Sequence, residues 1–262
     1  MLATTACKGG ERANARASVP RVAGPAAAIM DSAGEIVIPV PATSYIGAAV
    51  ANAGTVTGTV TLTGTLTPAP PASTGRDSTV CGATVADSSV QQRGPGLGGV
   101  VVWLDGVRRG KPIPLERRIE VESDHCLLTP RVQATVTNSA VNVVGHDDFR
   151  QHLHFVAAGE AAPRATVLLG KDEQVIPTEL PAKKPGMVIV RDSDHSWPSA
   201  YVAVFDHPYF AVTKPDGSFT IDGVPAGRYT VVTWHERAKK SEQKIEVGAN
   251  LVAKIALAVQ SR

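Results

Sequence analysis

Two cysteines in the middle of the chain offer the clearest chemistry. Cys81 and Cys126 lie far apart in the sequence, and neither belongs to a Cys-x-x-Cys pair or to a metal-ligand spacing. A disulfide is the economical interpretation, and in the chain-entropy model the closure of a loop of this size stabilises a fold by about 3 to 4 kcal/mol. The alternative is a pair of buried free thiols in a cytosolic chain. A disulfide favours a periplasmic or extracellular location.

Sequence patterns of common catalytic sites are missing. There is no Gly-x-Ser-x-Gly motif, and Trp234-His235-Glu236 lacks the second histidine of a zinc-protease helix. The glycine-rich run 94–99 precedes a strand pattern, so it lacks the helix N-terminus that binds phosphate in nucleotide-binding loops. We therefore expect a protein that is not an enzyme.

Charge and hydropathy argue against two further classes of protein. The 26 Lys and Arg residues nearly cancel the 24 Asp and Glu residues, and the net charge is +2. The basic residues form no stripe, so we expect no nucleic-acid partner. No stretch approaches the roughly 18 consecutive apolar residues of a membrane-spanning helix, so we expect no transmembrane span.

The first part of the chain, residues 1–53, is poor in large side chains and is expected to be flexible. Within it, small residues lead to Cys7 and then to a polar, glycine-rich stretch, which is similar to the end of a bacterial lipoprotein signal. Lipidation of Cys7 would tether the protein to a membrane, and it requires a true start before Met1 because no basic and apolar segment precedes the cysteine. The alternative is an ordinary unpaired cysteine.

Short strand patterns fill the remainder of the chain. From Gly54 onward, apolar and hydroxyl residues alternate with period two, which is typical of a half-buried strand. β-Branched runs separated by turn residues follow, and the clearest are 99–104, 131–137, 152–156, 187–191, 199–205 and 228–235. Helical periodicity is nearly absent. The sequence therefore predicts an all-β protein made of Greek-key β-sandwiches.

The segment from Gly186 to Thr213 resembles plastocyanin-like (cupredoxin) bacterial proteins, in which the metal-binding segment runs into a carboxypeptidase-regulatory-like module. The best match is Asp206-His-Pro-Tyr-Phe-Ala-Val-Thr213, and Asp216 to Glu236 is similar to a prealbumin-like or starch-binding-like sandwich. The resemblance covers residues 54–258. It implies a prealbumin-like domain made of residues 54–110 and 207–258, with a cupredoxin-like domain, residues 111–206, inserted in it.

The resemblance also implies positions for a copper site. One histidine is kept as His195, but Asp192 stands where the thiolate ligand belongs and Pro198 where the axial methionine belongs. A second imidazole would come from His152, with His154 on the same strand face. Blue copper requires the thiolate, so we expect no blue centre. His152, His154, Asp192 and His195 could still form an altered Cu(II) or Zn(II) site, and the alternative is a sandwich that has lost its metal.

These observations favour a secreted, periplasmic or membrane-tethered binding or structural protein that needs no cofactor, with copper binding as the alternative. The partner would be an unidentified protein or glycan. Fold analogy makes carbohydrate a candidate ligand, because Trp197, Tyr209 and Trp234 could stack on sugar rings. We expect two of these three rings to be buried in the core instead.

Overall fold

The computed structural model describes residues 45–171 and 174–262, so Cys7 lies outside the described residues. Almost all regular structure is β-strand, which confirms the all-β prediction. The two helical pieces are a 3₁₀ turn, η1 (Gly75–Asp77), and a single turn, α1 (Ser78–Cys81). No helix in the described part of the chain has the length and apolar character of a membrane span.

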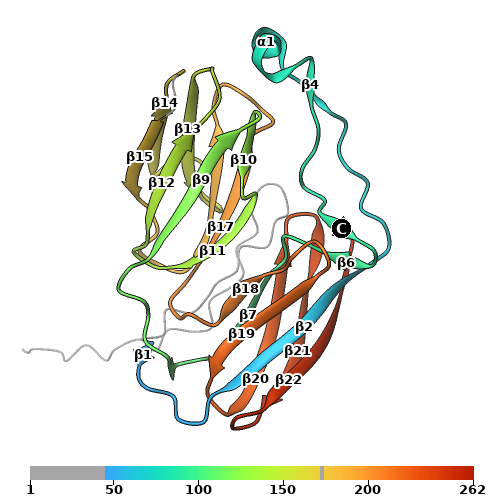
Figure 1. Ribbon diagram of the computed structural model, residues 1–262, viewed down its shortest axis with the longest axis vertical. Coiled ribbons are helices and arrows are strands. Elements are labelled where there is room, and N and C mark those ends of the chain that lie inside the picture. The colour runs from blue at the N-terminus through green and yellow to red at the C-terminus, as the bar shows by residue number, and fades with distance from the viewer. Residues whose placement is uncertain (1–44, 172–173) are drawn as a thin grey trace, which may run out of the picture.

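The lower sandwich in Figure 1 has two sheets. One sheet has the order β18 (Phe210–Val212), β7 (Val101–Asp105), β20 (Gly227–His235) and β21 (Ala238–Val247). The other has the order β19 (Ser218–Val224), β2 (Gly54–Thr63), β6 (Gly96–Leu97) and β5 (Gln92–Arg93), and β22 (Val252–Gln260) pairs in parallel with β2. The core between the sheets draws its buried residues from 56–107 and 209–259.

The upper sandwich is built from the chain between these two parts. Its outer sheet has the order β10 (Leu127–Thr129), β9 (Arg118–Asp124), β12 (Ala140–Gly145) and β15 (Gln174–Glu179). Its inner sheet has the order β11 (Val132–Val136), β17 (Ser199–Phe205), β16 (Gly186–Asp192), β13 (Gln151–Ala157) and β14 (Ala165–Leu169). Their shared core draws on residues 121–204.

The inner sheet of the upper sandwich packs against the sheet of the lower sandwich that contains β7 and β20. Strand β17 shows why, because Ala200, Val202 and Val204 face the upper core while Tyr201, Ala203 and Phe205 face the lower sandwich. A continuous apolar run, in place of an alternating one, indicates a strand that is covered on both faces. Ring contacts fill this interface, with centroids 5.6 Å apart for Trp103–Phe205 and 5.4 Å apart for Tyr201–Trp234.

Residues 45–53 differ from the flexible segment that we expected to reach residue 53. Strand β1 (Ile46–Gly47) pairs in parallel with β8 (Arg109–Gly110). The Tyr45 hydroxyl donates a hydrogen bond of 2.6 Å to the Lys111 carbonyl, and its ring contacts Tyr209 edge to face at 6.4 Å. The Tyr45 side chain thus helps to fix this stretch to the lower core. The low average hydrophobicity of residues 1–53 does not reveal this contact.

A long excursion leaves the lower sandwich after β2 and returns before β5. We call residues 67–89 the strap. Its two arms pair as β3 (Ala72–Ser73) and β4 (Thr84–Val85), and its tip carries η1 and α1 beside the far end of the upper sandwich (Figure 1). The strap therefore belongs to the lower sandwich by sequence and contacts the upper one at its tip.

Candidate functional site

Asp192 organises the loop that joins β16 to β17. Its Oδ1 atom accepts hydrogen bonds from the backbone N–H groups of His152 and Asp194, at 3.0 and 3.1 Å. An aspartate that bonds the backbone two residues ahead makes an Asx-turn, which reverses the chain at the end of a strand. This turn places His195 back over Asp192.

His195 is held between two carboxylates. Its Nδ1 lies 2.5 Å from Asp192 Oδ2, and its Nε2 lies 2.9 Å from Asp77 Oδ2, in the tip of the strap. The His195 and Asp192 side chains are 4% and 0% exposed. Burial lowers the pKa of His195, but the hydrogen bonds to Asp192 and Asp77 outweigh burial, and the pKa is raised overall. A protonated imidazole with a donor at each nitrogen matches these two acceptors.

Aromatic rings and a disulfide surround this imidazole. Phe149 meets the His195 ring edge to face at 5.0 Å, and Trp197 lies 4.8 Å from it. Cys81 of α1 and Cys126 form a disulfide, as predicted, and both pack in a small cluster with Phe149 and Trp197. Cys126 lies in the β9–β10 turn, and its N–H donates to the Asp147 carboxylate. The disulfide and the Asp77–His195 hydrogen bond together fix the tip of the strap.

The four predicted metal ligands do not gather into one set. Asp192 and His195 meet, but His152 and His154 alternate along β13 with buried residues and so lie on the opposite face. Leu153, between them, is the register partner of Asp192, so Asp192 faces the core side. His152 pairs through Nδ1 with Asp194 at 3.0 Å instead. In the described part of the chain, no group of three or more His, Cys, Asp or Glu residues is arranged to hold a metal ion.

These residues do not fit a blue copper centre. The only cysteines in the described residues bond to each other, so no thiolate faces His195. A metal-binding imidazole needs a free lone pair, whereas both His195 nitrogens contact carboxylates. The site is instead a carboxylate–imidazole–carboxylate chain, Asp77–His195–Asp192, in which His195 and Asp192 are buried and Asp77 is half-buried.

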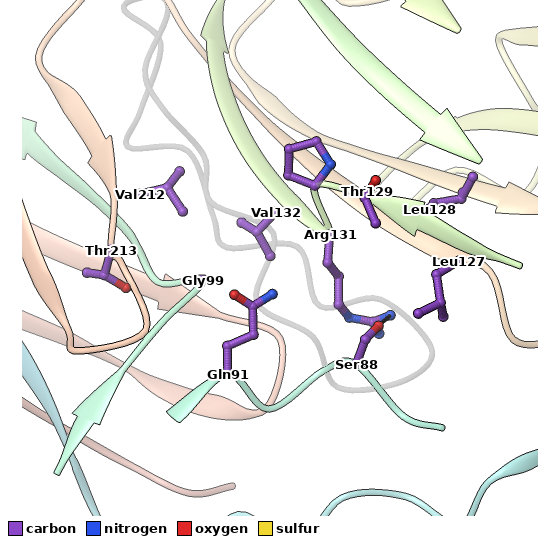
Figure 2. Close-up of a pocket in the computed structure, with 11 residues that line it drawn as sticks. Ser88, Gln91, Gly99, Leu127, Leu128, Thr129, Arg131, Val132, Val212 and Thr213 are labelled. Atoms are coloured by element: carbon purple, nitrogen blue, oxygen red, sulfur yellow. Dashed lines mark hydrogen bonds between the residues drawn. The ribbon is translucent and has the colours of Figure 1, made fainter. Parts of the chain in front are cut away.

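A second site lies at the seam between the two sandwiches. A pocket of about 430 Å³ is walled by apolar side chains of Leu127, Val132 and Val212, and Ser88 and Arg131 bring polar groups to it. Figure 2 shows the Arg131 side chain reaching toward Ser88 and the Gln91 amide pointing toward Val132. Nη1 of Arg131 contacts the Ser88 hydroxyl at 3.3 Å and the Ser199 carbonyl at 3.4 Å. We call this cavity the seam pocket.

The sugar-stacking residues are placed much as expected. Tyr209 and Trp234 are buried, and Trp197 is half-buried against His195. Every tryptophan, tyrosine and phenylalanine of the chain lies in the described residues, and each is buried or half-buried. The aromatic rings therefore serve packing, and none stands out as a flat, solvent-facing platform.

Neither a protein-family model nor a curated protein matches the chain. Among solved structures, a Cu-containing nitrite reductase from Thermus scotoductus SA-01 matches at 19% identity and TM-score 0.30, over 39% of this chain and 24% of that one. Amicyanin from Paracoccus versutus matches at 17% identity and TM-score 0.27, over 35% of this chain and 84% of that one. Likenesses this distant do not establish the metal content or the activity of this chain.

Proposed function

We propose that this chain is a non-enzymatic, extracytoplasmic binding protein whose ligand occupies the seam pocket. The observation that carries the proposal is the pocket's composition: apolar walls with a few converging polar groups, at the junction of two folded units. Ligand sites occur preferentially at such junctions and have volumes of about 300 to 1,000 Å³. The extracytoplasmic location rests on the disulfide, which persists in oxidising compartments.

The chemistry of the pocket favours a small neutral amphipathic ligand. The Arg131 guanidinium is already neutralised by Glu236, through bonds of 2.6 and 2.8 Å. A ligand therefore needs no negative charge, and a hydrogen-bond acceptor beside an apolar body is enough. No aromatic ring lines the pocket, so stacking on sugars has less support there than apolar contact.

A fluorescence titration tests this proposal. The neutral amphipathic dye N-phenyl-1-naphthylamine should become more fluorescent on binding wild-type protein. Val212→Phe should abolish the increase by filling the pocket, whereas Val252→Phe, on the exposed face of β22, should leave it unchanged. Equal binding by the two variants, or no binding by the wild type, would contradict the proposal. A glycan array with strong signals would favour the carbohydrate alternative.

A further inference from the structure

The base and the tip of the strap are held by different kinds of contact. At the base, Leu66 and Val90 pack in the lower core on either side of it. Arg237 donates to the Thr67 carbonyl at 2.8 Å and to the Asp87 carboxylate at 3.2 Å. These contacts come from the lower sandwich, so they do not depend on where the tip lies.

The tip has little packing of its own. Neither η1 nor α1 contains a buried residue, and the strap contributes buried Val85 and half-buried Cys81 to the small cluster around Phe149. The three larger cores take no residue from 67–89. Segments with few buried apolar contacts open at lower free energy than the core elements. The tip is therefore held mainly by the Cys81–Cys126 disulfide and by the Asp77–His195 hydrogen bond.

We propose that the Cys81–Cys126 disulfide is a redox-sensitive latch, and that its reduction by a dithiol releases the strap tip while both sandwiches stay folded. Release uncovers the His195 imidazole and the Trp197 indole, which the tip covers in the oxidised protein. The end of the sandwich where the sequence placed metal ligands thus acts as a docking site for the protein's own strap.

The two sulfur atoms differ in access, which fixes the course of the reduction. Cys81 is half-buried, whereas Cys126 is 1% exposed. A thiolate of the dithiol attacks the Cys81 sulfur and displaces the Cys126 thiolate, which takes up a proton. The second thiol of the reductant then attacks the reductant sulfur that is bonded to Cys81 in the mixed disulfide. This step closes a disulfide within the reductant and releases Cys81 as a thiol. The protein gains two thiols, and the reductant becomes a disulfide.

Hydrogen–deuterium exchange measures the release directly. After treatment with dithiothreitol, amides of residues 74–85 should exchange at least about tenfold faster, because their protection depends on docking. Amides of β2, β16 and β17 should keep their protection. Unchanged exchange in the strap would show that the disulfide is not a latch. Simultaneous loss of protection in both sandwiches would show that it staples the whole fold, and either result overturns the proposal.

Two variants separate the parts of the attachment. The double variant Cys81→Ser/Cys126→Ser should show fast strap exchange without any reductant. Asp77→Asn should change strap exchange little in the oxidised protein, where the disulfide holds the tip. It should raise exchange further in the reduced protein, where the tip opens and closes reversibly and this hydrogen bond favours the closed state. Asp124→Asn is the matched control, since Asp124 lies in the same region and its side chain pairs with exposed His125. Equal effects of the two Asn variants on the reduced protein would contradict the role of Asp77.

Discussion

Arg131 and Glu236 join the two sandwiches through a buried, two-pronged ion pair. Nε of Arg131 lies 2.6 Å from Oε1 of Glu236, and Nη2 lies 2.8 Å from Oε2. The side chains are 11% and 6% exposed. The guanidinium also lies over the Tyr201 ring, at 5.8 Å from its centroid. Together with the apolar contacts, the pair fixes the orientation of the two sandwiches, and its Arg131 side chain lines the seam pocket.

Removing one partner of this pair should be strongly destabilising. Arg131→Met leaves the Glu236 carboxylate buried without a counter-charge, and the free energy of unfolding should fall by about 3 to 5 kcal/mol. The double variant Arg131→Met/Glu236→Leu should recover much of the loss, because no buried charge remains. Urea denaturation of the wild type and both variants measures the effect. A double variant less stable than Arg131→Met would contradict this account.

The strands of this fold were predictable, but the stacking of its sheets was not. The runs 99–104 and 199–205 have apolar residues on both faces, which indicates double burial. The pattern does not say what covers the second face. In this fold the second faces of the two runs pack against each other, through contacts such as Trp103 with Phe205. Contacts between segments this far apart leave no local signal in one sequence.

The candidate site was predicted only in part for related reasons. Asp192 and His195 are close in sequence and meet as expected. His152 was placed with them, but a shift of one residue along a strand moves a side chain to the other face. Asp77 was missed because it lies 118 residues from His195 and reaches it through the strap. Locally, Asp77 looks like half of a surface pair with Arg76, 3.4 Å away.

A buried histidine should make the protein less stable in acid. Burial, and then the nearby cations Arg131, Arg237 and Arg262, lower the pKa of His235 to about 4. The unfolded chain takes up this proton near pH 6.5, so the stability that neutral His235 gives is present above that pH and is lost as pH falls toward 4. Between pH 7.5 and 4.5 the loss should be about 2 to 3 kcal/mol.

The variant His235→Gln isolates this contribution. Between pH 7.5 and 4.5, the unfolding free energy of the variant should fall by about 2 to 3 kcal/mol less than that of the wild type. The comparison is needed because the raised pKa of His195 acts in the opposite direction: its contribution is present below about pH 6.5 and is lost as pH rises through the folded pKa. Parallel pH profiles for wild type and variant would contradict the assignment.

The Asp216–Gly217 turn should not tolerate a side chain at its glycine. Gly217 has a φ of +79°, and a Cβ there would lie 2.2 Å from the Val60 carbonyl oxygen. Gly94, with a φ of +58° and open space around its Cβ position, is the matched control. Gly94→Ala should cost about 1 kcal/mol from backbone strain, and Gly217→Ala clearly more. Thermal unfolding of both variants checks the difference, and equal losses would refute the predicted clash.

The state of the His195 ring tests the central claim, that a carboxylate–imidazole–carboxylate chain occupies the end of the sandwich where the resemblance placed copper. We would record the ¹⁵N–¹H NMR spectrum of the histidine rings of oxidised protein at pH 6, before and after one equivalent of Cu(II). We expect protons on both ring nitrogens of His195, signals that Cu(II) does not broaden, and no intense blue absorption, because the charge-transfer band requires a Cu–thiolate bond. Selective loss of the His195 signals together with an intense blue band would contradict the account.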